Sequence, residues 1–87
     1  MKTIHLVLKH RWFEMIASGM KTEEYREIKP YYERLQNLKI GDRVVFHKGY
    51  SSITKKAVVD YCLKGYGIKF WGGDAEKKQW VIGFHLE

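Results

Sequence analysis

The sequence predicts a small α+β domain, a curved sheet or closed β-barrel of about five to six strands with two short helices. Three observations indicate this class. Several segments alternate apolar and polar residues with the period of two that is typical of strands, while two others have helical spacing. Glycines stand in or beside the strands, where they let a sheet bend. The 87 residues are enough for one domain and too few for two, so we assign 1–87 to a single domain.

The first half of the chain reads as a strand, a helix, an extended segment and a second helix. The strand is predicted at Thr3–Lys9, and the helix at His10–Ser18 carries one broad apolar stripe. Gly19 follows at the position where helices commonly end in a left-handed residue. Lys21–Ile28 is polar but extended in character. Pro30 suits the first turn of the second helix, whose apolar spacing is set by Tyr31, Tyr32 and Leu35.

The second half is richer in strands. A Gly-Asp turn leads into a strand at Arg43–His47, and Gly49–Thr54 reads as a loop. The next strand should place four apolar residues on one face: Ala57, Val59, Tyr61 and Leu63. Four glycines make residues 65–78 irregular, although Ile68–Trp71 could pair briefly. The clearest alternation lies in the last strand, Trp80–Leu86.

Charge and cysteine content narrow the functional class. Lys and Arg number 16 against 10 Asp and Glu, and the net charge of +6 favours anionic partners, nucleic acid first. These charges are spread along the chain, so the excess can equally serve solubility. The single cysteine, Cys62, excludes an intrachain disulfide and is typical of a buried, reduced thiol. With no signal peptide and no apolar run near about 18 residues, we expect a cytoplasmic monomer that does not enter membranes.

The most informative segment is residues 19–26, where Gly19, Lys21, Glu24 and Arg26 form the pattern G-x-K-x-x-E-x-R. In an extended segment Glu24 and Arg26 point to the same side, and Lys21 joins them if the backbone rotates at the turn. Glu24 could then hold Arg26 through a two-point ion pair and leave Lys21 free as a point charge. Arg26 would offer several donors to a phosphate or a base edge. The alternative is an edge strand of solvated charges.

This motif, directly after an amphipathic helix, resembles the ASCH domain family of the PUA-like superfamily of small β-barrels. The segment WFEMIASGMKTEEYREIKPYY is similar to the family's helix–motif–helix passage, and VIGFHLE is similar to its terminal barrel strand. The resemblance spans essentially the whole chain. It implies a small barrel that binds RNA or a nucleotide- or nucleoside-like ligand in a cleft lined by Gly19, Lys21, Glu24 and Arg26.

The same resemblance leaves enzymatic activity open. Some relatives are amidohydrolases that remove an acyl group from a modified cytidine, and others are reported as ribonucleases. In the deacylases the motif supplies a lysine, matched here by Lys21, and a nucleophilic threonine, whose place Glu24 takes; Thr22 is a different position. The chain also lacks the longer segment that carries an additional acidic residue in that group. An enzyme would therefore use Lys21 and Glu24, with Glu24 as the base. A protein-interaction barrel with a purely structural cluster is the third alternative.

Secondary candidates lie outside the motif. Lys48, Gly49 and Tyr50 follow a strand end, where Lys48 and Tyr50 could flank the cleft and contact the ligand. Trp71 could stack on a base, although a core or lid role suits it as well. The four histidines show no metal-ligand spacing, and no glycine-rich phosphate loop is present. We therefore predict neither a metal nor a cofactor.

Overall fold

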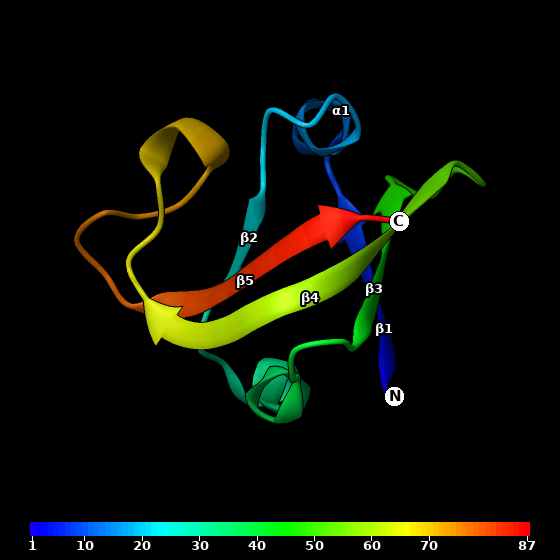
Figure 1. Cartoon of the computed structure of the whole chain (residues 1–87). Coiled ribbons are helices and arrows are strands. Elements are labelled where there is room, and N and C mark those ends of the chain that lie inside the picture. The colour runs from blue at the N-terminus through cyan, green and yellow to red at the C-terminus, as the bar shows by residue number, and fades with distance from the viewer.

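The computed structural model describes all residues from Met1 to Glu87 (Figure 1). Five strands, one α-helix and two 3₁₀ helices follow one another along the chain. In order they are β1 (Thr3–Leu8), α1 (His10–Ala17), β2 (Glu23–Arg26), η1 (Pro30–Asn37), β3 (Arg43–Lys48), β4 (Thr54–Gly65), η2 (Lys69–Trp71) and β5 (Gln79–Leu86). The predicted α+β class is confirmed.

The five strands form one curled sheet in the order β1-β3-β4-β5-β2 (Figure 1). β1 and β3 are parallel, because the long connection through α1, β2 and η1 returns the chain to the same end of the sheet. The other pairs are antiparallel. β1 and β2 are the two edges, and no main-chain ladder joins them. The predicted curvature is thus present, whereas the backbone leaves the expected barrel open along this seam.

The core lies inside the curl of the sheet. The alternation predicted for the first strand is observed, because Ile4, Leu6 and Leu8 are buried and the residues between them are exposed. α1 contributes Phe13 and Ile16 from its apolar stripe. η1 closes the opposite end, where Leu35 is its only buried residue. At roughly 25 cal/mol per Å² of apolar surface removed from water, burial of these side chains is the main force that curls the sheet.

One predicted alternation fails in the middle of β4. The register with β5 shifts between Val59 and Tyr61, so the extra residue Asp60 forms an irregularity of the β-bulge kind. Because a bulge reverses the faces that follow it, Tyr61 and Leu63 turn outward instead of continuing the buried face of Val59. Cys62 turns inward and contacts the core.

The segment after β4 also differs from the prediction. Lys69–Trp71 is a short 3₁₀ turn, so Ile68–Trp71 does not pair as a strand. The turn ends at Gly72, whose φ of 88° lies in the left-handed region that glycine adopts without steric cost. No helix of this protein combines the length and apolarity that crossing a membrane requires.

Candidate functional site

A tight bend at the end of α1 positions the motif. Gly19 has φ = 83°, and its backbone N–H donates to the carbonyl of Ile16 at 3.0 Å. The N–H of Lys21 donates back to the carbonyl of Met15 at 3.0 Å. These bonds satisfy carbonyls at the helix end and reverse the chain toward β2. Gly19 contributes to the site by allowing this bend, and it does not itself line the hollow described below.

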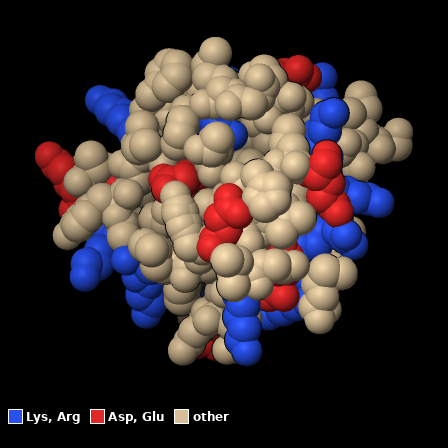
Figure 2. All heavy atoms as spheres, in the orientation of Figure 1, with Lys and Arg blue, Asp and Glu red and all other residues tan.

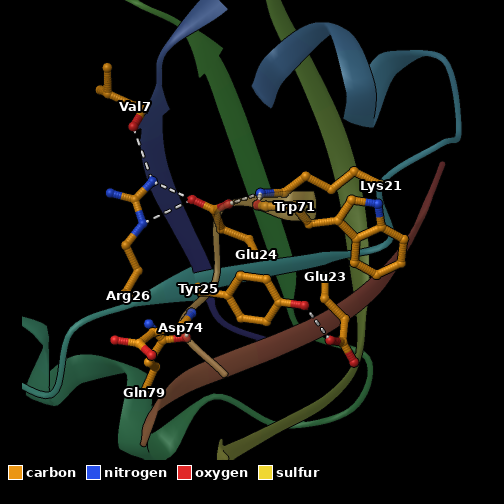
Figure 3. A network of polar contacts seen from close by, with 9 residues as sticks. All are labelled: Val7, Lys21, Glu23, Glu24, Tyr25, Arg26, Trp71, Asp74 and Gln79. Carbon is orange, nitrogen blue, oxygen red and sulfur yellow. Dashed lines mark hydrogen bonds and ion pairs between the residues drawn. The ribbon is translucent and has the colours of Figure 1, made fainter. Parts of the chain in front are cut away.

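Glu24 is the centre of a buried ion cluster (Figure 3). Its Oε1 lies 2.8 Å from Lys21 Nζ, and its Oε2 lies 2.8 Å from Nη2 and 3.1 Å from Nε of Arg26. The structure therefore brings the three charged motif residues together. Arg26 does contact Glu24 through two nitrogens, as expected, but both meet the single oxygen Oε2. The expectation that Lys21 remains free is wrong, since Lys21 pairs with the second carboxylate oxygen.

Lys21 is enclosed although it carries a charge. Only 2% of it is exposed, and its Nζ donates to the carbonyl of Trp71 at 2.5 Å. Nζ also lies 4.7 Å from the ring centre of Trp12 and 5.6 Å from that of Tyr25. A buried ammonium is tolerated only when anionic, carbonyl or aromatic partners replace its water, and all three are present.

Arg26 bridges the open seam of the sheet. Its Nη2 donates to the carbonyl of Val7 on β1 at 3.0 Å, and its Nη1 donates to the hydroxyl of Tyr32 at 3.2 Å (Figure 3 shows the contact with Val7). Arg26 itself lies on β2, the opposite edge strand. A side chain thus connects two edges that the backbone does not pair. The planar guanidinium suits this role, because it donates in several fixed directions at once.

A hollow of about 320 Å³ opens over this cluster. Lys21, Glu24 and Arg26 all line it, together with exposed Lys9 and Glu27. The rest of the wall includes five aromatic rings: Trp12, Tyr25, Tyr31, Tyr32 and Trp71. The cavity therefore combines aromatic rings with a fixed charged cluster, and its size lies at the lower end of the range for small-molecule sites.

The unused hydrogen-bonding capacity of the cluster consists mainly of donors. Lys21 has three N–H groups and two acceptors, Glu24 and the Trp71 carbonyl. Arg26 has five N–H groups, and four are used by Glu24, Val7 and Tyr32. Each cation retains one N–H. A ligand with carbonyl or phosphate oxygens would match these donors.

The other predicted contact residues lie elsewhere. Lys48 forms an ion pair with Glu14 on α1, and Tyr50 is fully exposed in the turn after β3. Gly49 has φ = 57° in the same turn, beside the ring of His10. None of Lys48, Gly49 and Tyr50 lines the hollow. The lysine that the sequence suggested for the cleft therefore stabilises the packing of α1 on β3 instead.

Several lining residues were missed at the level of sequence. Trp12 and Tyr32 belong to helical apolar stripes, which indicate core packing, yet both are only half-buried and face the hollow. Local spacing carries no signal that separates a ring in the core from a ring in a cavity wall. Trp71 lines the hollow, which is where it must lie if it stacks on a bound base.

A second polar group lies beside the cluster. The hydroxyl of Tyr25 donates to Glu23 Oε1 at 2.7 Å, and the hydroxyl of Tyr61 donates to Oε2 of the same carboxylate (Figure 3 shows the Tyr25 bond). Burial, reinforced by the bond to Glu23, raises the pKa of Tyr25 well above its usual range. The same causes raise the pKa of Tyr61 to about 12. Both phenols therefore stay protonated donors at neutral pH and hold the Glu23 side chain in place.

No protein-family model matches this chain, and no curated protein is detectably similar to it in sequence. The face shown in Figure 2 carries no patch of a single charge sign. On the side shown in Figure 2, Lys and Arg lie mostly toward the outline and acidic side chains are interspersed nearer the centre. The geometry of the hollow is therefore the feature that bears on function.

Proposed function

We propose that this chain is a small ASCH-like domain that binds RNA or a nucleotide- or nucleoside-like ligand in the hollow above Lys21, Glu24 and Arg26. One observation carries the proposal: five aromatic rings and a fixed cluster of donors line a single cavity of about 320 Å³. In this proposal Arg26 completes, through its side chain, the small barrel that the main chain leaves open. The single reduced cysteine fits a cytoplasmic monomer.

The chemistry of a nucleotide suits this wall. A base presents two π-faces, which can stack on rings such as Trp71 and Tyr31, and carbonyl oxygens, which accept from Arg26 or Lys21. A phosphate would add charge attraction to exposed Lys9 at the rim. The donors are held by Glu24 before any ligand arrives, so little ordering free energy is lost on binding.

The geometry favours binding over hydrolysis. A general base must accept a proton from water, but both oxygens of Glu24 are held by the cations Lys21 and Arg26. The hydrolase alternative has its own test. Turnover of acylated cytidine or labelled RNA that Lys21→Ala and Glu24→Ala both abolish would replace the binding proposal by an enzymatic one.

The binding test uses lining residues that contribute little to folding. Tyr31 is 63% exposed and Lys9 is exposed, so Tyr31→Ala and Lys9→Gln should leave the fold intact. Tyr50→Ala and Lys55→Gln are matched controls, because these residues are exposed and lie outside the hollow. Binding of uridine and cytidine monophosphates and of a single-stranded 12-nucleotide RNA is measured by quenching of tryptophan fluorescence and by calorimetry.

We expect Tyr31→Ala to weaken binding roughly 5- to 150-fold, the range of about 1–3 kcal/mol for one stacked base. Lys9→Gln should lower the salt dependence of RNA binding, by about 0.7 in the slope of log K against log salt. Arg26→Ala should weaken binding far more than Lys77→Ala, a distant exposed lysine. Equal losses in Tyr31→Ala and Tyr50→Ala, or no binding of any nucleotide, would refute the proposal.

A further inference from the structure

The connection between β4 and β5 exposes large apolar side chains next to the hollow. Tyr66 is 57% exposed, Ile68 is 47% exposed and Phe70 is 61% exposed. Trp71 and Gly72 follow directly and line the hollow. Rings that stand free in water usually mark a contact surface when several of them occur together. We name residues 66–73 the aromatic loop.

The aromatic loop has a fixed shape, because its two ends cross at a pair of glycines. A Cβ on Gly67 would lie 2.6 Å from the Cα of Gly73, so only glycines can approach this closely. Backbone N–H groups of Gly67 and Gly73 donate to the carbonyls of Asp74 and Ile68, each at 2.9 Å. The N–H of Asp74 donates to the side chain of Gln79 at 3.2 Å (Figure 3 labels both residues). The exposed rings are therefore carried by a closed, hydrogen-bonded turn.

Two contacts attach this turn to the motif. The carbonyl of Trp71 accepts from the buried ammonium of Lys21. Gly72 lies against the ring of Trp12, where a Cβ would come within 2.9 Å of the indole. The same residues that build the hollow thus determine where the aromatic loop stands, and Phe70 is one residue from the wall of the hollow.

The residues of this region suit an anionic, aromatic partner. Lys64 precedes Tyr66, Lys69 lies between Ile68 and Phe70, and two further lysines precede β5. Residues 64–78 contain four lysines and two acidic residues, Asp74 and Glu76, and therefore carry a net charge of +2 (4 − 2). Single-stranded RNA offers phosphates to the lysines and unpaired π-faces to the rings.

We propose that the aromatic loop is a second nucleic-acid contact, in which Tyr66 and Phe70 stack on bases next to the nucleotide held in the hollow and Lys69 neutralises a phosphate. This inference rests on the proposed function and narrows it, because the ligand becomes single-stranded RNA of several nucleotides instead of a free nucleotide. A preorganised turn favours such a contact, since its ordering has already been achieved during folding.

The test compares one nucleotide with a polymer of the same nucleotide. Uridine monophosphate and single-stranded oligouridine of 12 nucleotides are titrated into the wild type, Phe70→Ala, Tyr66→Ala and the control Tyr50→Ala. Tyr50 is an aromatic side chain that is also exposed, and its turn lies across the molecule from η2 (Figure 1). Melting curves of each variant check that folding is retained.

We expect Phe70→Ala to weaken oligouridine binding roughly 5- to 150-fold and to leave the affinity for uridine monophosphate within about twofold. Lys69→Gln should reduce the salt slope for oligouridine by about 0.7, whereas the exposed control Lys55→Gln should not. The aromatic loop proposal is wrong if the oligomer binds no tighter per site than the monophosphate, or if Phe70→Ala and Tyr50→Ala weaken oligouridine binding equally. Neither result contradicts the proposal that the hollow binds a nucleotide. If the monophosphate does not bind at all, the proposed function itself is wrong.

Discussion

Replacing Glu24 by glutamine tests whether the buried cluster is one electrostatic unit. Glu24 is 5% exposed and compensates two cations, of which Lys21 is 2% exposed and Arg26 has a side chain that is 16% exposed. Glutamine preserves the shape but removes the charge, and its single amide oxygen can accept from only one of the two cations while its NH2 group faces the other. Removing one partner of a buried ion pair costs about 3–5 kcal/mol.

This loss is large for a chain of 87 residues, whose total stability should be about 4–13 kcal/mol. At about 4–8 °C per kcal/mol, a loss near 3 kcal/mol lowers the melting temperature by about 12–24 °C. Urea unfolding, followed by tryptophan fluorescence at pH 7, measures the change in free energy directly. Glu27→Gln is the control, because the Glu27 side chain is 58% exposed and should contribute less than about 0.5 kcal/mol.

The double variant Lys21→Met/Glu24→Gln provides the sharper measurement. It removes the uncompensated ammonium together with the carboxylate, so we expect it to be more stable than the sum of the two single losses predicts, by about 1.5 kcal/mol or more. Two results would contradict the reasoning. One is a loss below about 1 kcal/mol in Glu24→Gln, and the other is additivity of the two substitutions within about 0.5 kcal/mol.

Two further predictions concern residues outside the cluster. The Asp42 carboxylate accepts hydrogen bonds from the backbone N–H groups of Lys2 and Lys39, and these bonds lower its pKa. Its stabilising contribution is therefore fully present above the unfolded pKa of about 3.9 and is lost as the pH falls through the lower pKa of the folded state. Acid unfolding curves of Asp42→Asn should lack that step, and an unchanged curve would contradict the assignment. Gly83→Ala would place a Cβ 1.9 Å from the Tyr61 ring, so we expect a loss of about 1–3 kcal/mol in urea unfolding that Tyr61→Ala relieves in the double variant. Equal losses with and without the Tyr61 ring would refute this contact.

Local chemistry was sufficient to predict most elements. The period-two segments identified β1, β3 and β5, and Gly19 marked the end of α1, because each of these depends on residues that are neighbours in sequence. The prediction of the buried face of β4 was wrong after Val59, because the irregularity at Asp60 depends on the register with β5. A register is a property of two strands, and the spacing of one strand does not contain it.

The features of the candidate site likewise divide into those that the local sequence determines and those that depend on the tertiary structure. The sequence by itself determined that Glu24 and Arg26 share a side of an extended segment and that a glycine bend precedes Lys21. Only the tertiary structure decided that Lys21 is buried under Trp12, that Arg26 reaches Val7 across the open edge, and that rings from separate elements enclose the hollow. These features join residues that lie far apart along the chain. They form only when burial of the core curls the sheet and brings its edges within reach of one side chain.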